Sequence, residues 1–398
     1  MAVPGYPLRE EVEATGYREP RQWWPGVLLA AFLMLIGAVG AVVVGGQLVQ
    51  FMLAGLQVFP FAVLAFFAYL GLRQGWARVV AFLCLLALLL GLAAVSILSV
   101  LGVLLIRAQA LGGSPDPAKL VAAITSPQLG VVTIWMIVGL AVAGLLLLPA
   151  VRRAAAQVLP IDPRSSVHAI ALSIVVGSTI MSFGQLVAAG GVPPILEMVK
   201  AVPEATNKAK GDTSDLLVMI YGFAWTFPGA LVAGGFPVVR TLREVLRRLG
   251  LVRPTTRQVL GAIGLAVLLA AGSMLLDAGI GRLWDYMGWA RTDNAAFEKL
   301  LGSAVSLPGA VVIGITAGLG EETVVRGVLQ PRLGILLSNL FFASLHAFQY
   351  GFDAVLSVFI IGLILGIVRS RSNTTTSSIV HGTYDFILIA LSALKLFQ

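Results

Sequence analysis

The sequence is poor in charged residues and in cysteine. Only 12% of its 398 residues are Asp, Glu, Lys or Arg, while 58% are hydrophobic; soluble domains carry roughly 25% charged residues. A soluble domain of this length could not cover its surface with so few charges. This excludes an ordinary cytosolic enzyme, a disordered protein and a nucleic-acid-binding module. The single cysteine, Cys84, excludes an internal disulfide and a cysteine-based zinc site.

Long apolar runs divide the chain into candidate membrane spans. Crossing a hydrocarbon core takes about 20 helical residues, and the runs are continuous rather than alternating in polarity, which argues against a β-barrel. We therefore predict an all-α polytopic membrane protein with about eleven transmembrane helices. The predicted spans are residues 26–47, 51–72, 79–106, 129–151, 167–188, 215–237, 258–277, 303–320, 334–350, 354–368 and 378–396.

The basic residues orient these spans. If the N-terminus lies inside, most Lys and Arg residues fall on the cytoplasmic side, as the positive-inside rule requires, and the densest basic stretch is residues 240–257. We predict a protein of the cell membrane with a cytoplasmic N-terminus and an external C-terminus. The predicted parts are a cytoplasmic segment at 1–25, a multi-span region of unknown role at 26–255 and a functional region at 256–398.

One group of ionisable residues lies in the stretch Gly-Leu-Gly-Glu-Glu-Thr-Val-Val-Arg-Gly near the end of the eighth predicted span. Charged groups at membrane depth are costly and are therefore functional candidates. Glu322 and Arg326 are four residues apart and can pair on one helix face. Glu321 is rotated by about 100° from Glu322, so it is left free for another task.

Two further pairs with the same spacing follow in later spans. Phe342 precedes His346 by four residues, and His381 precedes Asp385 by four residues. Helices that carry such pairs can bring them together in the interior of one bundle. We predict that the three groups form one polar site inside the membrane.

The residue types of this site suit the activation of water. Glu321 can take a proton from water while His346 shares or relays it. His381 and Asp385 can stabilise the oxyanion that develops at a peptide carbonyl. The same groups, with Glu321, His346 and His381 as ligands, could instead hold a zinc ion that acidifies the water. The sequence leaves both schemes open.

The three motifs, Glu-Glu-x-x-x-Arg at 321–326, Phe-x-x-x-His at 342–346 and His-x-x-x-Asp at 381–385, resemble those of the CPBP family. This family of CAAX proteases and bacteriocin-processing proteins, also called Abi, consists of intramembrane endopeptidases and includes the Ras-converting CAAX prenyl endopeptidase. The resemblance covers about residues 256–398, a CPBP-like protease domain, and says nothing about residues 1–255.

The resemblance implies cleavage of a peptide bond in a membrane-anchored or prenylated protein. By position, Glu321 would activate water with His346, and His381 and Asp385 would stabilise the oxyanion. The family has been described both as metalloproteases and as glutamate proteases, so zinc or no cofactor is expected. The expected partners are membrane lipids and the protein substrate, with no nucleic acid.

Two further expectations concern the supporting residues and the side of the membrane. Glu322 with Arg326 would brace the site. The position of Asp385 is usually Asn in the prenyl-protease branch, and an ionised aspartate donates no hydrogen bond, so Asp385 is expected to orient His381. Glu321 and His381 are expected near the cytoplasmic ends of their spans, where a lipidated tail would arrive.

Two other classes of function use the same residues differently. A catalytically silent family member would act as a scaffold or as a bacteriocin self-immunity protein. A transporter would use the polar side chains as a pathway through the membrane. Loss of peptide cleavage on replacing Glu321 or His346 would distinguish the peptidase from both.

Overall fold

The computed structural model describes residues 46–110, 117–201 and 214–396. The chain forms two compact units, Met1–Leu53 and Ala54–Gln398. Of the first unit, only residues 46–53 are described, and they include the start of helix α3, Gln47–Leu70. The predicted segment 1–25 and nearly all of the predicted first span, 26–47, lie outside the described residues.

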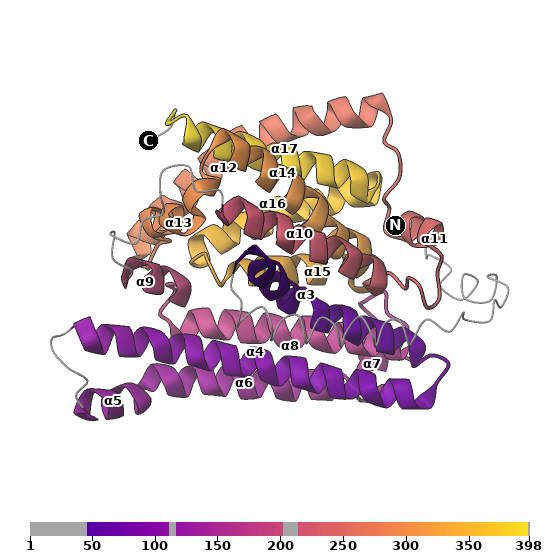
Figure 1. Cartoon of the computed structure of the whole chain (residues 1–398), viewed down its shortest axis with the longest axis horizontal. Helices are drawn as coiled ribbons and strands as arrows, with labels where there is room; N and C mark the ends of the chain where they lie inside the picture. Colours follow the sequence, from indigo (N-terminus) through magenta and orange to yellow (C-terminus); the bar gives the residue numbers. More distant parts are fainter. Residues whose placement is uncertain (1–45, 111–116, 202–213, 397–398) are drawn as a thin grey trace. The chain divides into compact units, whose positions relative to one another are not determined.

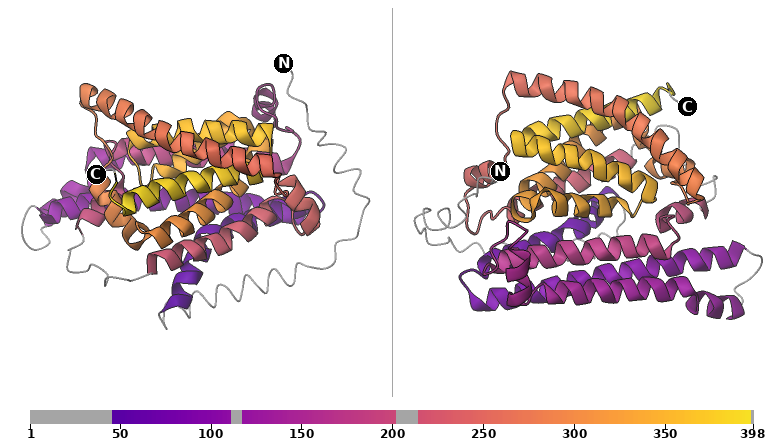
Figure 2. Two further views of the ribbon diagram at one scale, coloured as in Figure 1. Left: turned by 90° about the horizontal axis from the view of Figure 1, so that it is seen from above. Right: turned by 180° about the vertical axis from the view of Figure 1, so that it is seen from behind.

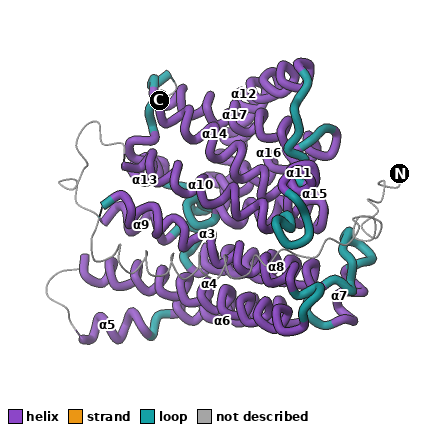
Figure 3. The backbone as a smooth tube through the Cα atoms, turned by 45° about the vertical axis from the view of Figure 1, so that its right-hand side comes forward, coloured by secondary structure: helices purple, strands orange, loops and turns teal. Residues whose placement is uncertain are grey.

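The described part of the chain is helical and contains no strand, which confirms the all-α prediction (Figure 3). After α3 the elements are α4 (Gly75–Ala110), α5 (Pro117–Ile124), α6 (Pro127–Leu145), α7 (Pro149–Ala155), α8 (Ser166–Ala188), α9 (Pro194–Ala201), α10 (Ser214–Ala233), α11 (Leu242–Arg248), α12 (Thr256–Met287), α13 (Asn294–Leu301), η2 (Gly302–Ala304), α14 (Leu307–Glu322), η3 (Thr323–Leu329), α15 (Gln330–His346), α16 (Phe352–Arg371) and α17 (Thr374–Ala393).

Eight helical segments of the described chain are long and apolar enough to cross a membrane. The protein is therefore an integral multi-pass membrane protein, while the predicted count of eleven spans stays a prediction. One of the eight segments, Leu307–His346, combines α14, η3 and α15. It covers most of the predicted eighth and ninth spans, with a kink at Gly334, where φ is +78°.

Helices α4, α6 and α8 pack side by side as one layer of the larger unit (Figures 1 and 2). Their contact is apolar, with Leu85, Leu89, Met136 and Met181 all less than 5% exposed. Leucines on the outer side of α4 are half exposed or more, as expected of a face in contact with lipid. Helix α8 also packs against α15, which joins this layer to the C-terminal helices.

A second apolar core joins residues that precede and follow position 255. Leu172 and Val175 of α8 and Leu249 after α11 pack with Val328 and Leu333 of the later helices. Helix α10 likewise packs against α14. The helices before residue 256 therefore help to hold the later helices in place, while the predicted boundary at 255/256 stays a prediction.

Close approach of α14 and α17 depends on glycine. A Cβ atom added at Gly318 of α14 would lie 2.7 Å from the Cα of Gly382 in α17. Small residues at such positions let membrane helices approach until their backbones touch. This contact brings the helix that carries Glu321 next to the helix that carries His381.

Candidate active site

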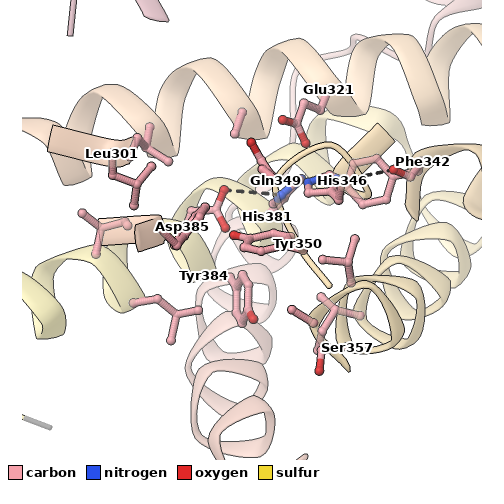
Figure 4. A pocket seen from close by; sticks show the side chains of 18 of the residues that line it. Leu301, Glu321, Phe342, His346, Gln349, Tyr350, Ser357, His381, Tyr384 and Asp385 are labelled. Atoms are coloured by element: carbon pink, nitrogen blue, oxygen red, sulfur yellow. Dashed lines mark hydrogen bonds and ion pairs between the residues drawn. The ribbon is translucent and has the colours of Figure 1, made fainter. Parts of the chain in front are cut away.

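A cavity of about 650 Å³ lies among α10, α12, α14, α15, α16 and α17. Its lining includes Glu321 from α14, Phe342 and His346 from α15, and His381 and Asp385 from α17. Figure 4 shows their side chains gathered around one space. Three motifs that lie far apart in the sequence thus meet at a single cavity.

Glu321 stands in the last turn of α14, half-buried, with its side chain at the cavity (Figure 4). No hydrogen bond or ion pair joins it to another residue in the described part of the chain. Its carboxylate is therefore available to a bound water or substrate.

The helix does not end at the glutamates. Helix α14 passes directly into the π-helical segment η3 at Thr323, so the helical run continues to Leu329. Glu321 consequently lies inside a continuous run rather than near its end, where the prediction placed it. Short π-helical segments occur often at functional sites, and here one carries the arginine of the motif.

Glu322 and Arg326 form the ion pair that their spacing predicts. The Nε of Arg326 lies 3.4 Å from Oε2 of Glu322, and both side chains are completely buried. Burying two charges is costly unless they are paired and hydrogen-bonded. Neither residue lines the cavity, so the pair belongs to the packing behind it.

Arg326 is held by two further residues of α15. Its Nη2 donates to Oδ1 of Asn339 at 3.2 Å, and its guanidinium carbon lies 5.3 Å from the centre of the Phe342 ring. Asn339 in turn donates to the backbone oxygen of Phe359 at 2.7 Å. Asn339 was not among the predicted site residues, although an amide inside a predicted span was the signal that could have identified it.

His381 connects the buried pair to the cavity. Its Nδ1 lies 3.2 Å from Oε1 of Glu322, and its Nε2 lies 3.4 Å from Oδ2 of Asp385. A carboxylate only accepts hydrogen bonds, so Nδ1 carries the proton in this contact. The hydroxyl of Ser377, another residue not identified from the sequence, also donates to Glu322. Glu322 therefore fixes the orientation of the His381 ring.

His346 is oriented by its own helix and by two aromatic rings. Its Nδ1 lies 3.0 Å from the backbone oxygen of Phe342. A carbonyl oxygen only accepts, so Nδ1 carries the proton and Nε2 of the neutral ring holds the free lone pair. The ring stands edge to face with Phe342 at 4.7 Å and is stacked with Tyr350 at 5.9 Å. Nε2 can therefore act as a proton acceptor in the cavity.

The predicted zinc ligands do not fit a metal as they are arranged. Among the residues that the structure describes, no three His, Cys, Asp or Glu side chains are grouped so that they could hold an ion. We therefore derive no step through a metal.

The cavity also holds polar residues outside the three motifs. Ser357 of α16 donates a hydrogen bond to Asp277 of α12, and both residues line the cavity together with Tyr384. Helix α10 contributes Phe223 and Thr226. These residues were not among the predicted site residues, because they share no spacing pattern with the motifs.

Comparison with protein families gives one finding. Residues 303–387 match the family model described as Rce1-like: Type II CAAX prenyl endopeptidase Rce1-like. The matched segment contains all three motifs and extends from η2 into α17. Comparisons with curated proteins and with solved structures gave no match.

Proposed function

Because residues 303–387 match the Rce1-like model of type II CAAX prenyl endopeptidases, we propose that the protein is a working intramembrane endopeptidase. Its substrate would be a membrane-anchored or prenylated protein. One observation carries the proposal. A single cavity is lined by residues of all three motifs, namely Glu321, His346, His381 and Asp385.

Glu321 and His346 activate the water in this proposal. The Glu321 carboxylate has no competing partner among the described residues, and Nε2 of His346 holds a free lone pair because Nδ1 faces the Phe342 carbonyl. Glu321 takes a proton from a water held between them, with His346 sharing or relaying it, as the water oxygen attacks the peptide carbonyl carbon. The proton then passes to the leaving amine when the C–N bond breaks. General acid–base catalysis of this kind contributes about 10²–10⁴-fold in rate.

His381 is the oxyanion donor. Its Nδ1 proton is held by Glu322, which leaves Nε2–H as the group that can face a developing negative charge. Asp385, whose Oδ2 lies 3.4 Å from Nε2, orients the ring, and the developing oxyanion would share the Nε2–H with this carboxylate. A donor positioned in this way lowers the energy of the tetrahedral intermediate.

Glu322 and Arg326 act as positioning residues in this proposal. They touch His381 and Phe342 rather than the cavity. Because their charges are buried and paired, they hold α14, α15 and α17 in one register. Loss of either charge would disturb the site through its neighbours.

The test is a substrate panel with purified protein. It contains a prenylated CAAX peptide, its unprenylated form and several transmembrane peptides, each incubated with wild type, Glu321→Ala and His346→Ala. Cleavage by wild type that is lost in both variants supports the proposal. Cleavage that persists in both would overturn the site assignment.

Two controls separate the alternatives. Glu298→Ala changes an exposed glutamate of α13 that is not part of the cavity lining, and it should leave cleavage unchanged. If wild type cleaves no peptide of the panel, the scaffold or immunity role is favoured. Protein-dependent solute flux in liposomes that both site variants retain would instead indicate a transporter.

A further inference from the structure

The two ends of the helices in the unit Ala54–Gln398 differ in charge. One end is formed by the α3–α4 turn, the α6–α8 connection with α7, the α10–α12 connection with α11, and the α16–α17 turn. We call this end the arginine face. It carries two acidic residues, Asp162 and Glu244, against thirteen arginines: Arg73, Arg78, Arg152, Arg153, Arg164, Arg240, Arg243, Arg247, Arg248, Arg253, Arg257, Arg369 and Arg371.

The other end of the same helices carries charges of both signs. It includes α5, α9, α13 and the turn at residues 347–351, and we call it the mixed face (Figure 1). Several of its basic residues are paired with acids: Arg107 lies 3.2 Å from Glu197, Lys200 lies 2.8 Å from Asp293, and Arg291 lies 3.2 Å from Asp285. The Lys200 ammonium also holds the pKa of the Asp293 carboxyl below its usual range. By the positive-inside rule, the arginine face is cytoplasmic and the mixed face is external.

The cavity reaches the mixed face. Arg291, Asn294 and Leu301, all from the connection between α12 and η2, belong to its lining, and Arg291 and Asn294 are exposed. In Figure 4, Leu301 lies at one end of the cavity and Glu321 near the other. The candidate catalytic residues therefore lie at the inner end of a cavity whose rim is on the mixed face.

On the side of the arginine face, the site is closed by a buried polar layer. Glu322, Arg326, Thr374 and Ser377 are 0% exposed. Gln330, 5% exposed, donates to the backbone oxygen of Gly366 and to the Ser370 hydroxyl, both at 2.9 Å. These buried residues lie behind the site and are not part of the cavity lining, whereas residues of the mixed face are.

We propose that the site accepts its substrate from the non-cytoplasmic side of the membrane. The substrate class would then be the external segment of an exported or membrane-anchored protein, rather than a cytoplasmic lipidated tail. That the cavity binds a substrate rests on the proposed function, but the side from which the cavity opens does not depend on catalysis. It reverses the sequence-based expectation that the site faces the cytoplasm.

Cysteine labelling in intact cells tests the side directly. In full-length protein with Cys84→Ser, single cysteines are introduced at Asn294 on the cavity rim, at Thr316 in the cavity wall and at Arg253 on the arginine face. A membrane-impermeant maleimide should label Asn294→Cys and Thr316→Cys in intact cells as fully as in permeabilised cells. Arg253→Cys should be labelled only after permeabilisation. The opposite pattern would overturn the inference.

A matched control separates the cavity from general exposure. Ile315 is 56% exposed on the outer surface of α14, next to Thr316, but does not line the cavity. Ile315→Cys should stay unlabelled, because a thiol that faces lipid meets little water. Equal labelling of Ile315→Cys and Thr316→Cys would count against an open cavity, because the cavity wall would then be no more accessible to water than the lipid-facing surface.

Sided cleavage then separates this inference from the proposed function. A peptide that is cleaved in the panel is fused to a single-span anchor on the external end or on the cytoplasmic end and expressed with the protein. Glu321-dependent cleavage of the external fusion alone supports both proposals, whereas cleavage of the cytoplasmic fusion alone retains the function and overturns the side. If neither fusion nor any panel peptide is cleaved, the function fails while the labelling still decides the side.

Discussion

Nδ1 of His381 lies 3.2 Å from Oε1 of Glu322, so two adjacent glutamates of one motif have separate tasks. Glu322 is buried and orients a histidine of another helix, while Glu321 is half-buried at the cavity. Successive residues of a helix point about 100° apart, which is why neighbours in the sequence can serve the interior and the cavity at once. The predictions that follow test this division of roles.

Replacing Glu321 with Gln should abolish most activity without unfolding the protein. The amide cannot accept a proton from water, so kcat should fall by about 10²–10⁴-fold. The melting temperature in detergent should stay near that of wild type, because Glu321 has no hydrogen-bond or ion-pair partner among the described residues. Initial rates and thermal unfolding measured on one preparation check both parts, and a fall in kcat below tenfold would contradict the assigned role.

Replacing Glu322 with Ala should mainly destabilise the protein. The change leaves the fully buried Arg326 charge without its partner, and breaking a buried pair costs about 3–5 kcal/mol. The double variant Glu322→Leu with Arg326→Met should recover part of that stability, because no charge is then left buried. Unfolding of the detergent-solubilised variants measures the difference, and a double variant less stable than the single one would contradict the explanation.

Asp385 should act through His381 rather than directly on the substrate. Asp385→Asn keeps an oxygen that can accept from Nε2 of His381, so it should lose less activity than Asp385→Ala. Hydrogen bonds to charged groups contribute about 1.5–3 kcal/mol, which corresponds to roughly a 10- to 100-fold fall in kcat for the alanine variant. KM should change little in both variants. If both variants lose activity equally, the negative charge of Asp385 is required and a hydrogen-bond acceptor at this position is not sufficient.

Replacing Gly318 with Leu should separate α14 from α17. A Cβ atom at this position would meet the backbone of Gly382 at 2.7 Å, and overpacking typically costs about 1–3 kcal/mol. Activity should fall together with stability, because the contact aligns Glu321 with His381. Gly264→Leu is the matched control, since Gly264 lies in α12 with open space around its added Cβ. A similar loss in the control would contradict a specific contact.

Helix α10 should influence substrate choice although it lies outside the matched segment. Phe223 of α10 lines the cavity, so Phe223→Ala should raise KM and alter the order of preference among the panel peptides, with a smaller effect on kcat. The neighbouring residue Ala224 is exposed and does not line the cavity. Ala224→Leu should therefore behave as wild type, and identical kinetics for both variants and wild type would exclude α10 from the binding surface.

Much of the site could be predicted from local sequence. The spacing of Glu322 and Arg326 predicts their ion pair, because residues four apart lie on one helix face. Similarly, the rarity of charge inside apolar runs identifies Glu321, His346, His381 and Asp385 as candidates. Asn339, Ser377 and the residues of α10 could not be identified in this way, because their role depends on which helices become neighbours.

Sequence alone establishes an all-α membrane protein, because composition and continuous apolar runs act within single helices. It also determined which few polar residues need an explanation at membrane depth. The folded chain, in contrast, places Glu321 at the cavity, buries Glu322 and lets the cavity reach the mixed face. These features depend on the packing of α10, α12, α14, α15, α16 and α17, and such contacts between distant segments leave no periodic signal in the sequence.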